Sequence, residues 1–71
     1  MRTRDEHLAW CKKRALAYLD QYDVQNAVTS MLSDMKEHPE TPVNEYIAAL
    51  GVILATNEDE HEARRWIEGF R

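Results

Sequence analysis

The sequence predicts an all-α fold: four short helices forming two antiparallel helical hairpins, over residues 3–38 and 41–70 of a single domain spanning 1–71. Apolar residues recur at spacings of three and four along most of the chain, which is the period of a half-buried helix. Each apolar segment follows a residue that favours a helix start. An offset of 36 residues also aligns Ala15 with Gly51, as expected of two similar hairpins whose helices cross closely at small residues.

The first helix is expected from Thr3 to about Asp20. Thr3 and Glu6 have the spacing of a capping box, in which each side chain accepts a hydrogen bond from the backbone N–H of the other residue. One face of this helix is apolar and is predicted to be buried: Leu8, Cys11, Ala15, Leu19 and Tyr22, with Tyr18 at its edge.

The second helix is expected to begin after Asp23, a favourable N-cap. It should end near Glu37, because the ring of Pro39 disfavours helical geometry at the residue before it. Its apolar stripe comprises Val24, Ala27, Val28, Met31, Leu32 and Met35.

The third helix is expected to have Thr41 as its cap and Pro42 at its first position. From Val43 to Ala55 it is apolar on almost every face, so it is predicted to be the central and most enclosed helix. Gly51 in its interior lowers helix propensity, which favours a close approach of another helix backbone at that point.

The fourth helix is expected to begin at Asn57, with acidic residues in its first turn, where they meet the positive end of the helix dipole. Its apolar stripe comprises Ala63, Trp66, Ile67 and Phe70. Gly69 marks its C-cap or a frayed end.

Composition narrows the function classes. Of the 71 residues, 44% are hydrophobic and 31% are charged, which is typical of a globular domain. The longest uncharged stretch is too short to span a membrane, and the N-terminus lacks the apolar region of a secretory signal, so a cytoplasmic location is expected. Residues 1–19 carry a net charge of +3 and residues 20–71 a net charge of −7. This balance argues against a general nucleic-acid binder.

No catalytic motif, phosphate-binding loop or cysteine pair occurs in the sequence, so neither enzymatic activity nor a cofactor is expected. His7 and Cys11, one helical turn apart, come closest to a nucleophile site or a pair of metal ligands. Cys11 falls in the buried stripe, however, and is predicted to be a small core residue. Two ligands do not complete a tetrahedral site, so no metal is expected.

Trp10 projects from the first helix on the side opposite the apolar stripe. An indole next to basic side chains has the composition of a binding hot spot. We therefore expect partner binding by Trp10, Lys12, Lys13 and Arg14. The alternative is that Trp10 packs on the chain terminus or on the fourth helix.

The two hairpins resemble the tetratricopeptide repeat. The matching residues are Ala15, Tyr18, Ala27, Met31 and Pro39 in the first half and Leu50, Gly51, Leu54, Ala63, Ile67 and Phe70 in the second. The resemblance implies similar helix packing and a peptide groove between the first and third helices, presenting Ala9, Lys12 and Leu16.

Over nearly its whole length the chain also resembles a group of small uncharacterised proteins of tailed bacteriophages. The resemblance lies in Arg4-Asp5-Glu6-His7-Leu8, Trp10, Arg14-Ala15-Leu16, Tyr18, Ser30-Met31, Ser33-Asp34, His38-Pro39-Glu40-Thr41 and Arg64-Arg65-Trp66-Ile67-Glu68-Gly69-Phe70. It implies a phage origin and the cytoplasm of a bacterial host.

Together these observations predict a non-enzymatic protein-interaction module that binds or inhibits a bacterial host protein, or that binds another phage protein. Two alternatives stay open. One is a self-assembling structural or accessory phage protein, such as a homodimer. The other is an acidic mimic of nucleic acid that inhibits a host DNA-binding enzyme through the charge of residues 20–71.

Overall fold

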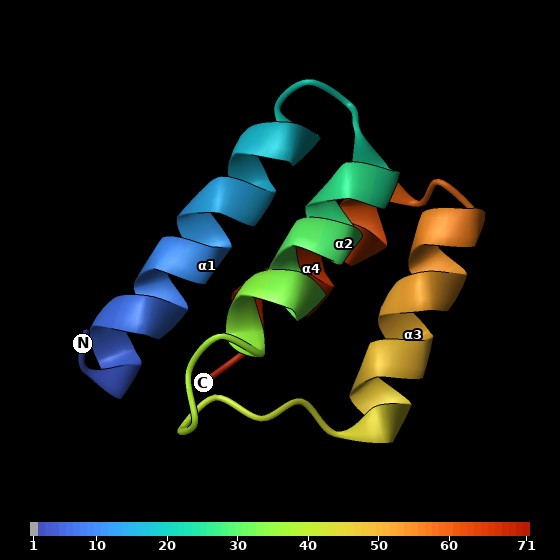
Figure 1. Ribbon diagram of the computed structural model, residues 1–71. Coiled ribbons are helices and arrows are strands. Elements are labelled where there is room, and N and C mark those ends of the chain that lie inside the picture. Colours follow the sequence, from blue (N-terminus) through green and yellow to red (C-terminus); the bar gives the residue numbers. More distant parts are fainter. Residues whose placement is uncertain (1) are drawn as a thin grey trace.

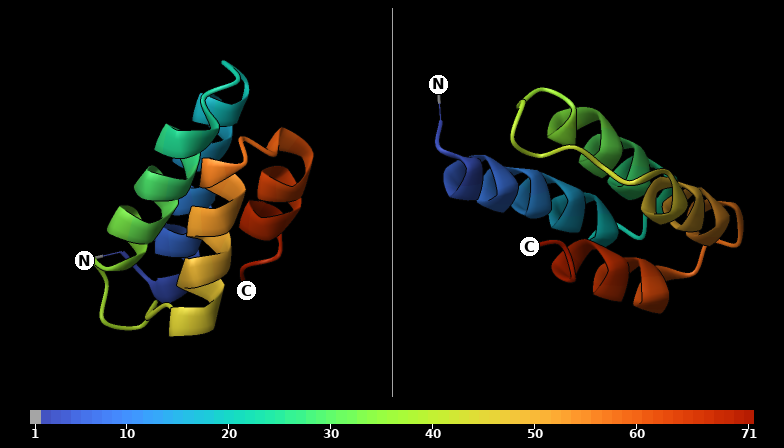
Figure 2. Two further views of the ribbon diagram at one scale, coloured as in Figure 1. Left: turned by 90° about the vertical axis from the view of Figure 1, so that its right-hand side faces the viewer. Right: turned by 90° about the horizontal axis from the view of Figure 1, so that it is seen from below.

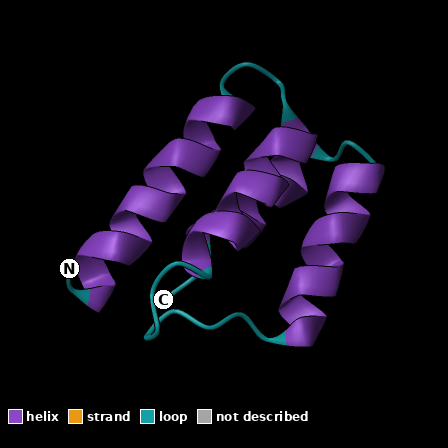
Figure 3. Cartoon of the chain, viewed as in Figure 1, coloured by secondary structure: helices purple, strands orange, loops and turns teal. Residues whose placement is uncertain are grey.

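The computed structural model describes residues 2–71 and consists of four helices joined by loops (Figure 1). Within these residues there is no strand (Figure 3), so the predicted all-α class is confirmed. The helices are α1 (Arg4–Leu19), α2 (Val24–Met35), α3 (Glu45–Thr56) and α4 (Glu60–Glu68).

The helices form two antiparallel hairpins, α1 with α2 and α3 with α4, as the sequence predicted (Figure 1). Helices α1, α2 and α3 lie side by side in that order, and α4 packs against one face of this layer and contacts all three (Figure 2). Because α2 lies between them, α1 and α3 do not touch. The expected peptide groove between the first and third helices is therefore not formed.

The helix starts follow the predicted cap chemistry in α1 and α2. The Thr3 hydroxyl accepts from the backbone N–H of Glu6, and the Thr3 N–H donates to the Glu6 carboxylate at 2.9 Å, which completes the capping box. Asp23 accepts from the backbone N–H of Asn26 at the start of α2.

The core lies between α1, α2 and α4. It contains the predicted stripes of these three helices almost completely: Leu8, Cys11, Ala15, Leu19, Val24, Ala27, Val28, Met31, Met35, Ala63, Trp66 and Ile67. Tyr22 is an exception, with 79% of its surface exposed. The helical period no longer applies at Tyr22, because α1 ends at Leu19 and Tyr22 has a positive φ of 59°.

The predicted start of the third helix is wrong. Asn44, not Thr41, is the N-cap, and α3 begins at Glu45. Thr41 instead is buried, and its hydroxyl donates to the carbonyl of Met35 at 2.6 Å. This bond satisfies a backbone acceptor at the end of α2, where the helix itself provides no donor.

The predicted start of the fourth helix is wrong as well. Asn57 is the C-cap of α3, Glu58 has a positive φ of 51°, and Asp59 caps α4. Gly69 is the C-cap of α4, as one of the two expectations had it.

The prediction that the third helix is central and most enclosed is also wrong. Helix α3 lies at the edge of the layer and packs only against α2 and α4. Gly51 is its only buried residue. An apolar pattern indicates which residues favour burial, but the number of neighbouring elements decides how many of them are buried. Helix α3 has neighbours on one side only.

Gly51 does mark a close approach, but by a side chain and not by a helix backbone. The indole of Trp66 lies over Gly51, and a Cβ atom there would stand 2.5 Å from Cζ2 of the ring. The Trp66 Nε1–H donates to the carbonyl of Ile47 at 3.0 Å. These two contacts fix which side of α3 faces the core.

Across residues 2–71, no helix is long and apolar enough to cross a bilayer.

Candidate functional site

Trp10 is half-buried and is surrounded by groups of its own chain. The guanidinium of Arg2 lies 4.0 Å from the ring centroid and that of Arg14 lies 4.7 Å from it. The imidazole of His7 stacks on the indole with a centroid distance of 5.5 Å. The electron-rich faces of the indole thus already have cationic partners within the protein.

The basic residues expected around Trp10 are divided between two edges of α1. Arg14 reaches α2, where its Nε lies 3.5 Å from the carboxylate of buried Asp34. Lys12 reaches α4 and donates to the carbonyl of Glu68 at 3.1 Å. Lys13 is exposed and has no hydrogen bond or ion pair with the described residues. The structure therefore brings Trp10 and Arg14 together and separates Lys12 from them.

Two buried histidines near Trp10 bond to backbone carbonyls: His7 ties α1 to α2, and His38 holds the N-terminal segment. His7 Nε2 lies 2.6 Å from the carbonyl of Asp34, and His38 Nε2 lies 2.8 Å from the carbonyl of Arg2. The backbone N–H of Glu40 donates to His38 Nδ1 at 3.0 Å, so the proton of a neutral His38 ring is on Nε2 and points to Arg2. These hydrogen bonds explain why the Arg2 side chain lies over Trp10, which the helical period of α1 could not reveal.

Cys11 is fully buried, which confirms its prediction as a core residue. Burial raises the pKa of its thiol from 9.0 to about 11, and the nearby carboxylate of Asp34 contributes in the same direction. The thiolate, which is the nucleophilic form, is therefore scarce at neutral pH. No group of three or more potential metal ligands occurs within residues 2–71.

Five of the six large apolar side chains that are exposed among residues 2–71 lie on α3, the helix that was expected to be the most enclosed. Tyr46 is 87% exposed, and four further large apolar residues of the helix are between 43% and 55% exposed. We call this surface the α3 face; it comprises Tyr46, Ile47, Leu50, Val52 and Ile53. Single exposed apolar residues are common, whereas five on one short helix form a patch.

The α3 face carries no charge. Between Glu45 and Glu58 the sequence has no Asp, Glu, Lys or Arg. A water-exposed helix normally has charged residues on its outer side. The signal that could have identified this surface was therefore present in the sequence, but a buried helix has the same pattern.

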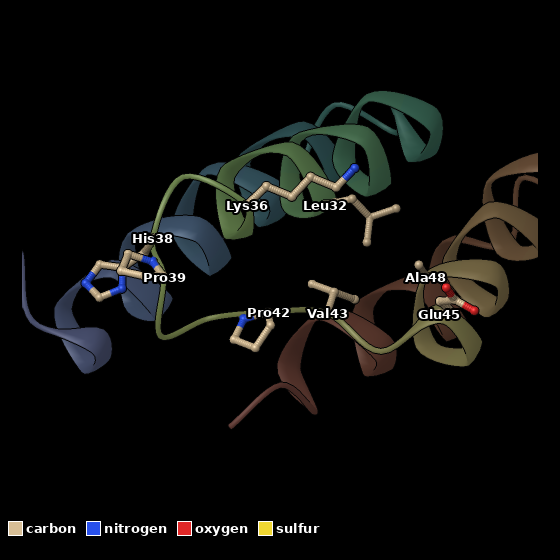
Figure 4. Close-up of a pocket in the computed structure, with 8 residues that line it drawn as sticks. All are labelled: Leu32, Lys36, His38, Pro39, Pro42, Val43, Glu45 and Ala48. Atoms are coloured by element: carbon tan, nitrogen blue, oxygen red, sulfur yellow. The ribbon is translucent and has the colours of Figure 1, made fainter.

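A cleft of about 510 Å³ lies beside the α3 face, between the C-terminal half of α2 and the N-terminal half of α3 (Figure 4). Leu32 of α2 and Val43 of the connecting segment form its apolar floor, and Ala48 lines it from α3 (Figure 4). Lys36 and Glu45 stand on its two sides. The cleft extends the apolar surface of α3 toward α2 and ends at charged residues.

Comparison with protein families, with curated proteins and with solved structures gave no match.

Proposed function

We propose that this chain is a non-catalytic protein-interaction module and that the α3 face is its binding surface. The observation that carries the proposal is the exposure of five large apolar side chains on one helix that has no charged residue along the exposed length. Removing apolar area from water contributes roughly 25 cal/mol per Å², so covering this surface favours association.

The α3 face is suited to binding because it is preformed. The indole of Trp66 over Gly51 and its hydrogen bond to Ile47 hold α3 in one rotation about its axis. A rigid surface loses little conformational entropy on binding, which leaves more of the contact free energy for affinity.

The basic surface expected around Trp10 is the weaker candidate. A partner that used Trp10 or Arg14 would compete with the contacts that these side chains make with His7, Arg2 and Asp34. The α3 face involves no such competition, since its side chains make no hydrogen bond or ion pair with the described residues.

The resemblance to small proteins of tailed bacteriophages suggests where this module acts. It favours a phage protein in the cytoplasm of a bacterial host, with a protein of the host or of the phage itself as partner. The buried thiol of Cys11 is in keeping with a role without catalysis.

The test is a capture experiment from phage-infected cells with three proteins: wild type, Leu50→Glu and Lys13→Glu. Leu50→Glu places a carboxylate in the middle of the α3 face, and Lys13→Glu places the same group at an exposed position of α1 near Trp10. We expect Leu50→Glu to lose the partners of the wild type and Lys13→Glu to retain them, with equal helical circular dichroism. Retention by Leu50→Glu, or loss by Lys13→Glu alone, would overturn the proposal.

A further inference from the structure

We infer that the partner of the α3 face is a second copy of this chain, bound through the same face in an antiparallel two-fold dimer. The inference rests on the proposed function, because it names the occupant of the same surface. Two features support it: the position of the charges and the residues along the middle of the face.

The distribution of charge suits pairing with an identical surface. In a two-fold dimer, residues near the axis meet their own copies, so a charged residue there would face a like charge. Between Glu45 and Glu58 there is none, although the protein has a net charge of −4. If the partner were a positively charged protein, acidic residues would be expected on the α3 face.

Charge also selects the antiparallel arrangement. The C-terminal end of α3 is followed by acidic residues, Glu58, Asp59 and Glu60, which a parallel pair would bring together. The antiparallel pair separates the two acidic ends and places each beside the start of the other α3, where Glu45 is an acidic neighbour and Lys36 a basic one. It also directs Lys36, at the cleft beside the start of α3, toward Glu58 of the other copy. Lys36 and Glu58 are exposed and have no ion pair within the described part of the chain. In this arrangement the two helix dipoles are antiparallel, which is electrostatically favourable.

The spacing along α3 fits helix-on-helix packing. Tyr46, Leu50 and Ile53 are four and three residues apart, so they form one ridge along the exposed side of the helix. Ala49 lies beside this ridge and is small and exposed, which lets a second helix approach closely. Leu50 lies at the middle of the ridge, so it is the residue nearest to the two-fold axis.

The exposed apolar area is that of a small, weak interface. From their exposed fractions, the five side chains present roughly 500 Å² in each copy, so a pair that covered all of them would bury about 1,000 Å², below the roughly 1,200 Å² at which standard specific interfaces begin. A chain of 71 residues buries a smaller share of its surface than a larger domain does, and dimerisation compensates for that.

The first test is sedimentation equilibrium of the purified wild type and of Leu50→Glu over a broad concentration range. We expect twice the monomer mass for the wild type at high concentration. Leu50→Glu should raise the dissociation constant at least about 30-fold, as is typical of a central interface residue. The Lys13→Glu variant should have the same mass in sedimentation equilibrium as the wild type. A wild type that stays monomeric, or a Leu50→Glu variant that still dimerises with equal affinity, would overturn the inference.

The second test does not depend on how well Leu50→Glu folds. Leu50→Cys in a Cys11→Ser background places thiols near the axis, and mild oxidation should yield a covalent dimer. Ala17→Cys in the same background is the control on an exposed site of α1 and should stay monomeric. Equal cross-linking of the two variants would contradict the geometry.

The outcomes separate this inference from the proposed function. Suppose that the wild type is monomeric and that its capture of other proteins requires Leu50. This result overturns the inference of a dimer and supports the binding role of the α3 face. A monomeric wild type whose capture of other proteins does not depend on Leu50 overturns that role itself.

Discussion

The indole of Trp66 occupies the space that a side chain at Gly51 would need: an added Cβ would stand 2.5 Å from Cζ2 of the ring. Because the same indole donates to the carbonyl of Ile47, α3 is fixed in its rotation as well as in its distance from α4. The side of α3 that bears Tyr46, Leu50 and Ile53 therefore points to solvent. Exposure of an apolar face is thus a consequence of packing in the core.

Gly51→Ala tests this packing. Alanine favours a helix interior by about 1 kcal/mol over glycine, so propensity alone predicts stabilisation. The clash with the Trp66 ring instead predicts a net loss of about 1–2 kcal/mol, within the range of overpacked cores. Urea denaturation monitored by circular dichroism measures the difference. A stabilised variant would show that the ring does not lie over Gly51.

Trp66→Phe tests whether that loss comes from the indole. The smaller ring leaves room for a Cβ atom at position 51, so Gly51→Ala should be less harmful in the Trp66→Phe background than in the wild type. We expect a coupling free energy of about 1 kcal/mol from the double-mutant cycle. Additive effects would mean that the two residues do not share the contact.

The sequence predicted the local features of the fold correctly where nearby residues decide them. The capping box of Thr3 and Glu6 and the cap at Asp23 depend on residues within one helical turn. The buried stripes of α1, α2 and α4 follow from the helical period, since each of these helices covers another in the core.

The surfaces could not be predicted in the same way, because distant parts of the chain decide them. The apolar pattern of α3 is compatible with burial on all sides, and only the position of α3 at the edge of the layer exposes it. The environment of Trp10 depends on His38, which binds the carbonyl of Arg2 across 36 positions of sequence. Thr41 looked like a cap, but tertiary contacts direct its hydroxyl to the end of α2.

Cys11 predicts a dependence of stability on alkaline pH. Burial raises the pKa of its thiol from 9.0 to about 11, so the unfolded chain loses this proton before the folded chain does. The contribution of the protonated Cys11 thiol to the free energy of unfolding is fully present below pH 9. It is lost as the pH rises toward 11, by up to about 1.4 kcal/mol per pH unit. Denaturation curves should show a steeper decline for the wild type than for Cys11→Ala. Parallel declines would contradict the burial of the thiol.

Thr3→Ala tests the capping box at the start of α1. Hydrogen bonds from the backbone N–H and the hydroxyl of Thr3 hold the pKa of Glu6 below its usual 4.5. Losing the hydroxyl cap should lower the free energy of unfolding by about 1 kcal/mol. The pKa of Glu6 should rise toward 4.5, as measured by NMR titration of its carboxyl carbon, while Thr3→Ser keeps both properties. An unchanged Glu6 pKa in Thr3→Ala would speak against a role of the hydroxyl.

We expect the protein to bind its partner through the exposed apolar side of α3. The most direct measurement is a dilution series of ¹⁵N-labelled protein followed by amide NMR shifts. The predicted result is that concentration-dependent shifts concentrate in residues 46–53. Shifts that change around Trp10, Lys13 and Arg14 while those of α3 stay constant would contradict it.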